Sequence, residues 1–288
     1  MAAANMKDVK RRIKSVESTM QITKAMQLVA SSKMRRAKEK AEAVHPFFET
    51  LVDTMCRICS DKSFSSIFTR KRASQAALVI VIAGDRGLAG GFNSNVLKSA
   101  EETINKFRTD GIKVKIMAIG KKSVEYFEKR DYEMLGRYPQ IAEGLDVYDT
   151  VDIAELIIDG FKAQDFDSVS LVYTTFVSAM TQEPCSLQIL PVENFHGLGE
   201  TMKKSAVEYD PSPEEVFDGM IPQYMCGVLY SAIVDSFAAE QAARRTAMES
   251  ASDNANEMID KLSLMYNRAR QAQITQEITE ISSAQIDN

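Results

Sequence analysis

The chain has 288 residues, of which 45% are apolar and 26% charged, a composition typical of a soluble folded protein with room for two domains. No segment approaches the roughly 18 uninterrupted apolar residues of a transmembrane helix, and the N-terminus lacks the apolar core of a secretory signal, so we expect a cytosolic chain. The net charge of −5 combines +8 over residues 1–40 (eleven Lys/Arg, three acids) with −8 over 210–288 (five Lys/Arg, thirteen acids), so the basic end can be neutralised within the chain rather than by nucleic acid.

Residues 5–58 are predicted to form one long helix. Positions taken at alternating steps of four and three from Val9 are apolar apart from two neighbours, Thr23 and Gln27, which is a strong coiled-coil pattern. Pro46 interrupts the pattern and is expected to bend or break the helix. The seam positions are Val9, Ile13, Val16, Met20, Thr23, Gln27, Ala30, Met34, Ala37, Ala41, Val44, Phe48, Leu51, Met55 and Ile58.

Cys56 and Cys59 form a CxxC pair near the end of this helix, a spacing found in redox sites and in halves of zinc sites. A zinc site would need a second pair, but Cys185 and Cys226 are isolated and the sequence has only two histidines. We therefore expect the pair to be structural and predict no metal site.

The middle of the chain alternates between strands and helices, which indicates a compact α/β domain with a small, mostly parallel sheet. Residues 194–213 are expected to link this domain to the C-terminal segment. The predicted strands are 77–83, 114–120, 168–176 and 186–192, and the predicted helices are 94–108, 121–130 and 149–163.

A glycine-rich loop, AGDRGLAGGFN (residues 83–93), follows the first predicted strand, where phosphate-binding loops of α/β proteins occur. Its spacing matches neither GxGxxG nor GxxxxGK[ST], it contains no lysine, and Asp85 would repel a phosphate. We therefore interpret the glycines as permitting a tight turn and a close helix–sheet approach. Asp85 and Arg86 could form an ion pair with a role in assembly. Since motifs of hydrolases and metalloenzymes are also missing, we predict a noncatalytic chain without cofactor.

Residues 214–284 are predicted to form a second long helix. A four-and-three series from Tyr230 is again apolar except for two neighbours, Gln241 and Arg244. The seam positions are Tyr230, Val234, Phe237, Gln241, Arg244, Met248, Ala251, Ala255, Met258, Leu262, Met265, Ala269 and Ala272.

The two apolar seams and the opposite net charges of the chain ends predict that the long helices pack on each other, antiparallel because the middle domain connects them. The predicted fold class is α/β: a long antiparallel two-helix coiled coil plus a small Rossmann-like α/β domain. The predicted boundaries are 1–60 and 210–288 for the coiled-coil helices and 75–195 for the α/β domain. The predicted length of the C-terminal helix is roughly 105 Å and that of the N-terminal helix roughly 80 Å, so the C-terminal helix is expected to extend beyond its partner.

Long motifs at both ends resemble the gamma subunits of F-type ATP synthases. RRIKSVESTMQITKAMQLVASSKMRRAK (residues 11–38) closely resembles the N-terminal helix of that family, and residues 239–281 resemble its C-terminal helix. DRGLAGGFNSNV (residues 85–96) is similar to the loop of its middle domain. The resemblance covers essentially the whole chain in order. The ending SSAQIDN departs from the Gly-Ala ending usual in the family.

The resemblance implies a central rotor shaft. The paired helices would stand, in a single copy, inside a ring of alternating alpha and beta subunits, with the α/β domain beside the epsilon subunit on the membrane c-ring. Ion-driven rotation would be coupled to ATP synthesis or hydrolysis on the beta subunits. The complex would lie peripherally on the cytoplasmic face of the bacterial inner membrane, without nucleic acid.

The resemblance also implies contact residues. Charged and amide groups suit such contacts because their hydrogen bonds can form and release through water. Tyr209 and Asp210 would face the membrane ring and the epsilon subunit at the foot. The residues expected to contact beta are Met26, Arg244, Arg270, Gln271, Thr275 and Glu277.

Two other classes of function remain open on the residues alone. A nucleotide-dependent enzyme would bind its ligand as an isolated chain through the glycine loop. A nucleic-acid-binding or scaffold protein would bind DNA through its basic end in a salt-sensitive way.

Overall fold

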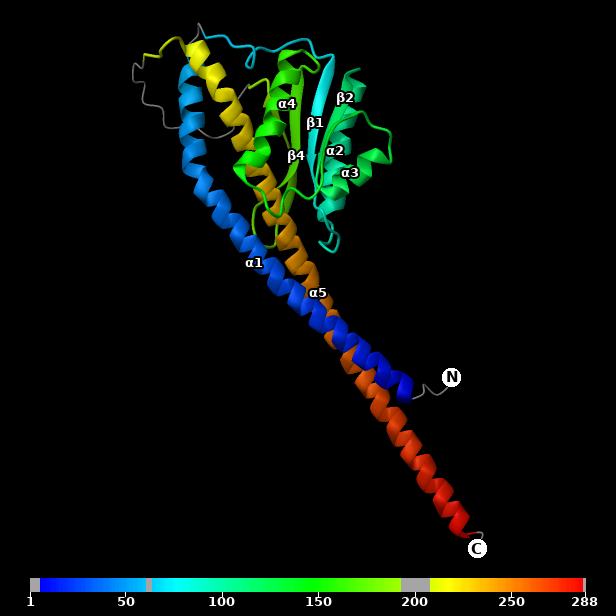
Figure 1. Cartoon of the computed structure of the whole chain (residues 1–288). Coiled ribbons are helices and arrows are strands. Elements are labelled where there is room, and N and C mark those ends of the chain that lie inside the picture. The colour runs from blue at the N-terminus through cyan, green and yellow to red at the C-terminus, as the bar shows by residue number, and fades with distance from the viewer. Residues whose placement is uncertain (1–5, 61–63, 193–207, 287–288) are drawn as a thin grey trace. The chain divides into compact units, whose positions relative to one another are not determined.

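The computed structural model describes residues 6–60, 64–192 and 208–286. By their contacts the residues form two units, the first from residues 1–31 and 244–288 and the second from residues 32–243. The long helices α1 (Met6–Cys59) and α5 (Pro213–Ile286) contribute to both units (Figure 1). Both predicted long helices are confirmed. Most of the predicted linker 194–213 lies outside the described residues.

Helix α1 continues through Pro46, so the predicted break is wrong. Proline removes one backbone N–H, which deprives the Glu42 carbonyl of its helical donor. The neighbours Val44 and Phe48 are partly buried against the apolar core of the second unit, and the Thr50 hydroxyl donates to the Pro46 carbonyl at 2.9 Å. Tertiary packing on both sides of the proline therefore keeps the helix continuous.

The second unit contains a five-stranded sheet of order β3-β2-β1-β4-β5, in which only β5 is antiparallel to its neighbour. A short hairpin joins β4 to β5, whereas each parallel pair needs a longer crossover. This confirms the mostly parallel sheet. The strands are β1 (Ala76–Ile82), β2 (Lys113–Ile119), β3 (Met134–Tyr138), β4 (Ser168–Phe176) and β5 (Gln182–Leu190).

Strand β3 was not predicted, because its five residues, MLGRY, include a glycine and an arginine and show no apolar alternation. Strand β5 begins four residues before the predicted start at 186. The connecting helices are α2 (Phe92–Thr109), α3 (Lys121–Glu128) and α4 (Val151–Lys162), the last preceded by the short 3₁₀ helix η1 (Val147–Thr150).

Both faces of the sheet are covered. Leu78, Ile80 and Ile82 of β1 face a core that includes side chains of α1, α4 and α5. Val79 and Val81 face a second core built with α2 and α3. Successive strand residues point to opposite faces, so a continuous apolar strand such as ALVIVI is what a sheet buried on both sides requires.

In the first unit, α1 and α5 run antiparallel (Figure 1). Every predicted seam position of α1 from Val9 to Ala30 is buried or partly buried, and the same holds in the second unit from Met34 to Ile58. The N-terminal seam is therefore confirmed along its whole length.

The C-terminal seam is only partly correct. Beyond Met248 the predicted positions Met258, Met265 and Ala272 are exposed, whereas Ser252, Ile259 and Tyr266 are buried or partly buried. The buried series therefore takes its four-residue step where the predicted series takes a three-residue step, and the reverse. The two series lie on nearly the same face of the helix, so the positions of apolar residues do not distinguish them. The buried series also contains the polar Ser252, which is why the sequence favoured the other one.

Candidate interaction surfaces

The glycine loop is fixed by hydrogen bonds within the second unit. Asp85 Oδ1 accepts from the backbone N–H groups of Lys121 and Gln140, each at 2.8 Å. Asn93 Oδ1 accepts from the Gly84 N–H at 2.8 Å, and its Nδ2 donates to the Arg86 carbonyl at 3.1 Å. The polar side chains of the loop thus tie together the ends of β1 and β2.

Two glycines are required by close approaches. A Cβ on Gly84 would lie 2.7 Å from Cδ of Glu240, a buried residue of α5. A Cβ on Gly120 would lie 1.9 Å from the Ala83 carbonyl oxygen, at a φ of +89°. Within the loop, the structure therefore supports the packing interpretation at Gly84, whereas nothing lies within 4 Å of a Cβ at Gly87 or Gly90. We call the contact between the loop and α5 the loop seat.

The loop seat is apolar beside Gly84. Ala89 and Phe92 form a small buried cluster with Ala239 of α5. Phe176, at the end of β4, packs on the cluster, its N–H donates to Asp235 Oδ1 of α5 at 3.2 Å, and the Lys38 ammonium of α1 lies 4.1 Å from its ring centroid. Both long helices are thus attached to the same edge of the sheet.

Glu143 connects the loop to α1. Its carboxylate pairs with Lys33 and lies 3.9 Å from Arg86 Nη2, while the Lys40 ammonium donates to the Leu145 carbonyl at 2.8 Å. The predicted Asp85–Arg86 ion pair is wrong, because Asp85 is occupied by backbone N–H groups and Arg86 turns to Glu143 instead.

The polar interruption at Thr23 is a buried contact between the helices of the first unit. Thr23 Oγ1 lies 2.7 Å from Ser252 Oγ. Thr23 Oγ1 is also 2.9 Å from the Met20 carbonyl, and Ser252 Oγ is 2.9 Å from the Met248 carbonyl. Two hydroxyl hydrogens serve three contacts, so the chain of hydrogen bonds can run in either direction.

The CxxC pair has the properties of packing residues. Burial raises the pKa of Cys56 to about 11, with a smaller contribution from Asp53. Burial, followed by the neighbouring Cys56, raises the pKa of Cys59 to about 12. Both thiols therefore remain protonated and poorly nucleophilic near neutral pH. Among the described residues no three His, Cys, Asp or Glu side chains gather as a metal site, and no helix is long and apolar enough to cross a membrane.

Comparison with known proteins decides the family. The family model described as ATP synthase matches residues 5–285. The ATP synthase gamma chain of Ruminococcus albus is 68% identical over 285 residues, which cover 99% of both chains. The chain belongs to the gamma-chain family of ATP synthases. The sodium-ion-specific ATP synthase gamma chain of Acetobacterium woodii is 41% identical, with 97% of each chain covered.

Solved ATP synthases contain the same fold as this gamma chain. A chain of the Euglena gracilis mitochondrial ATP synthase (OSCP/F1/c-ring) superposes with a TM-score of 0.68 at 17% identity, covering 98% of this chain and 93% of that one. A chain of the Tetrahymena thermophila mitochondrial central stalk and c-ring gives a TM-score of 0.58 at 24% identity, with 80% and 99% covered. The resemblance found in the sequence is confirmed, as is the fold class.

The residues expected to contact beta fall into two groups in this gamma chain. Met26 is partly buried and Arg244 is buried, only 8% exposed, so these side chains are largely enclosed by their own chain. The exposed group lies on the C-terminal part of α5, where the Thr275 hydroxyl donates to the Gln271 carbonyl at 2.9 Å. Its members are Arg270, Gln271, Thr275 and Glu277.

The two foot residues also differ. Tyr209 is partly buried against the apolar core of the second unit, whereas Asp210 is exposed. Tyr209 therefore anchors the start of the segment that leads into α5, and only Asp210 is fully available to a partner.

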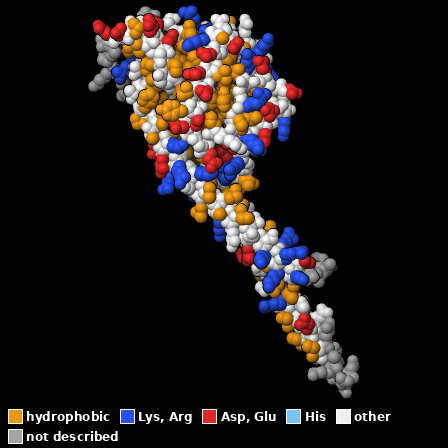
Figure 2. All heavy atoms as spheres, in the orientation of Figure 1, with side chains coloured by type: hydrophobic (Ala, Val, Ile, Leu, Met, Phe, Trp, Pro, Cys, Tyr) orange, Lys and Arg blue, Asp and Glu red, His pale blue; other side chains and the backbone are white. Residues whose placement is uncertain are grey.

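The sequence reasoning missed an apolar stripe near the C-terminal end of α5. Ile274, Ile278 and Ile281 are 45%, 61% and 63% exposed, and their spacing of four and three residues places them on one helix face. On α1, Ile22, Leu28 and Val29 are also exposed. Figure 2 shows apolar side chains on the surface of the paired helices. Exposed apolar stripes of this kind mark protein–protein contacts.

Proposed function

We propose that this gamma chain is the central rotor shaft of an ATP synthase and couples ion-driven rotation of the membrane c-ring to ATP synthesis or hydrolysis. The observation that supports it best is the surface of the first unit. Its two helices bury a seam that ends at Ala269, and the following part of α5 is exposed on all sides up to residue 279 although it carries the apolar stripe of Ile274, Ile278 and Ile281. A shaft enclosed by other subunits needs such a surface, whereas an isolated coiled coil would carry polar residues there.

The partners follow from this role. The alpha and beta subunits surround the shaft. The beta subunit contacts the exposed side chains on the C-terminal part of α5, which are Arg270, Gln271, Thr275 and Glu277. Met26 and Arg244 support a second contact with beta. The foot, with Tyr209 and Asp210, meets the epsilon subunit and the c-ring. Residues 1–60 and 210–288 act as the shaft and residues 75–195 as the domain that receives the torque.

The chain itself is noncatalytic and needs no cofactor. ATP is made and hydrolysed on the beta subunits, and the chain is a peripheral component on the cytoplasmic face of the cell membrane. The structural use of the glycine loop supports this role, since Gly84 and Asp85 are engaged with α5 and with backbone N–H groups.

A reconstitution tests the proposal. We would measure MgATP hydrolysis by matched alpha and beta subunits with the full-length chain, without it, and by the chain alone. Strong turnover in the complete mixture only is the expected result. Turnover by the chain alone would refute the noncatalytic role and return the glycine loop to consideration as a nucleotide site.

Rotation is tested in the same complex. Tyr148 is 82% exposed, so Tyr148→Cys offers a site for biotin and a bead, while the alpha/beta ring is fixed to a surface. We expect MgATP to drive rotation of the bead in one direction. A bead that stays still while the same complexes hydrolyse ATP would refute the shaft.

A further inference from the structure

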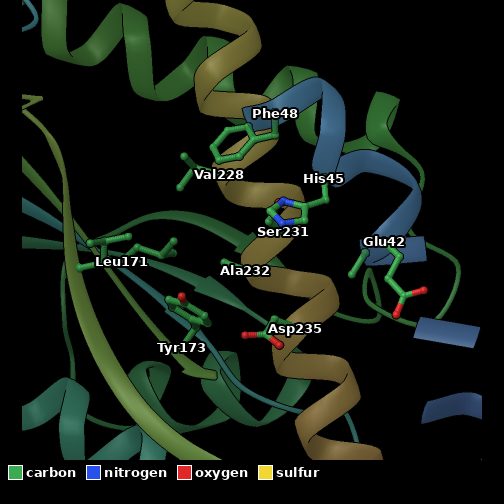
Figure 3. Close-up of a pocket in the computed structure, with 11 residues that line it drawn as sticks. Glu42, His45, Phe48, Leu171, Tyr173, Val228, Ser231, Ala232 and Asp235 are labelled. Carbon is green, nitrogen blue, oxygen red and sulfur yellow. The ribbon is translucent and has the colours of Figure 1, made fainter. Parts of the chain in front are cut away.

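The second unit contains a half-open cavity of about 430 Å³ between α1, α5 and the strands β4 and β5. Helix α1 contributes Glu42, His45 and Phe48, the strands contribute Tyr173, and α5 contributes Asp235 (Figure 3). The volume is in the range of small-molecule sites. None of the contact residues implied by the family resemblance lines it.

The cavity has apolar walls and one carboxylate inside. Leu171, Leu187, Val228 and Ala232 form much of the lining together with the Phe48 ring. In Figure 3 the Asp235 carboxylate and the Tyr173 hydroxyl lie close together toward one end, and Phe48 lies toward the other. An apolar pocket with an aromatic ring at one end and a carboxylate at the other favours ligands that have an apolar body and a positive charge at one end.

Among the residues that the structure describes, one backbone N–H donates to the Asp235 carboxylate. Its Oδ1 accepts from the Phe176 N–H at 3.2 Å. Burial raises the pKa of Asp235, whereas that N–H and the Lys38 ammonium lower it. Lys38 itself lies over the Phe176 ring, 4.1 Å from its centroid. A half-buried carboxylate with a single weak backbone donor gains from a further positive charge.

The other polar groups at the cavity favour a cation over an anion. Burial, followed by Cys185, raises the pKa of Tyr173 to about 12, so the residue stays a neutral hydroxyl that can accept from an ammonium. Glu42 adds a second carboxylate at the rim. His45 also lines the pocket, and its Nε2 lies 3.3 Å from Glu49 on the same helix. Aromatic faces and carboxylates together are the groups that recognise organic cations.

We propose that this cavity binds a small organic monocation with an apolar body, an arylalkylammonium, through an ion pair with Asp235. The ammonium lies between the carboxylate and the Tyr173 hydroxyl, and the aryl group lies against Phe48 and the aliphatic walls. This site is independent of the role of the chain as a shaft.

The test is a direct binding measurement on the full-length chain. The probe is 4-phenylbutylammonium, and its matched neutral control is 4-phenylbutan-1-ol, which has the same body without the charge. For a probe of this size we expect a Kd on the order of 1 mM, within reach of ligand-observed NMR. The alcohol should bind at least about tenfold more weakly.

Three variants locate the site. Asp235→Asn retains an oxygen for the Phe176 N–H while removing the charge, and should weaken the ammonium at least about tenfold with little effect on the alcohol. Glu42→Gln at the exposed rim should change the affinity less than threefold, by roughly the value of a surface ion pair. Ala232→Phe fills the chamber and should abolish binding of both probes.

Three results would overturn the proposal. The first is equal affinity of the chain for the amine and the alcohol. The second is equal affinity of the wild-type chain and Asp235→Asn for the amine. The third is no saturable binding of the amine by a chain whose circular dichroism confirms folding. Melting curves of the three variants, recorded in parallel, distinguish lost binding from lost structure.

Discussion

The loop seat can be tested by adding one methyl group. In Gly84→Ala the new Cβ would lie 2.7 Å from Cδ of Glu240 and 2.9 and 3.0 Å from its two carboxylate oxygens, all well inside ordinary contact. Glu240 is only 5% exposed, so its side chain has little room to withdraw. Overpacking of this kind costs about 1–3 kcal/mol.

The matched control is Gly87→Ala in the same loop, because nothing lies within 4 Å of a Cβ at Gly87. There the added methyl only restricts the unfolded chain and should be neutral or slightly stabilising. Thermal unfolding of the full-length chain, followed by circular dichroism, should show Gly84→Ala melting roughly 3–9 °C below Gly87→Ala, at about 3 °C per kcal/mol.

A double mutant identifies the cause. Glu240→Asp shortens the side chain by one methylene and should recover about 1–2 kcal/mol of the loss in the Gly84→Ala background. If Gly84→Ala melts with Gly87→Ala, or if Glu240→Asp fails to reduce its cost, the loop does not depend on this close approach and the reasoning is refuted.

Three further predictions follow from the same structure. Ser252→Ala should destabilise the first unit by about 1 kcal/mol, because the Thr23 hydroxyl loses its contact on the facing helix and keeps only the Met20 carbonyl. Ser252→Ala with Thr23→Val should be closer to wild type. Urea unfolding measures both variants, and equal losses would contradict the hydrogen-bonded pair. The pKa values of Cys56 and Cys59 are raised in the folded chain, so their contribution to stability is fully present below the ordinary thiol pKa near 9 and is lost as the pH rises toward 11–12. The free energy of unfolding of the wild-type chain should therefore fall over that pH window. It should fall less in the variant in which both cysteines are replaced by alanine. Ile278→Asp should leave the melting temperature of the chain unchanged but lower MgATP hydrolysis of the reconstituted complex, with Ile278→Leu as the control; unchanged hydrolysis would exclude the stripe as a contact.

The elements with strong periodicity could be predicted from the sequence alone. The α1 seam repeats over seven heptads, and ALVIVI has the continuous apolarity of a strand covered on both faces. Strand β3 could not be predicted, because its pairing with β2 rather than its own pattern stabilises it. The predicted phase of the α5 seam was wrong for a related reason. The buried hydroxyl of Ser252 is accommodated by Thr23 on the facing helix and by the Met248 carbonyl, and neither contact can be seen in the pattern of apolar residues.

The residues of the candidate surfaces could likewise be predicted only in part. The composition of the glycine loop was enough to argue against a phosphate site, since Asp85 would repel an anion. The residue that Gly84 approaches could not be predicted from the sequence. Glu240 lies on a helix far away in the sequence, and a glycine does not indicate which residue packs against it. The stripe at Ile274, Ile278 and Ile281 was visible in the spacing, but these residues lie outside the seam that the heptad search followed.

The exposed stripe of α5 also bears on the fate of chains that fail to assemble. A chain without its partners presents Ile274, Ile278 and Ile281 to chaperones and proteases, which recognise exposed apolar segments. Surplus copies should therefore be short-lived, and the supply of partner subunits would set the number of shafts in the cell. Pulse-chase labelling would show a half-life that lengthens when alpha and beta are co-expressed, and an unchanged half-life would argue against this form of stoichiometry control.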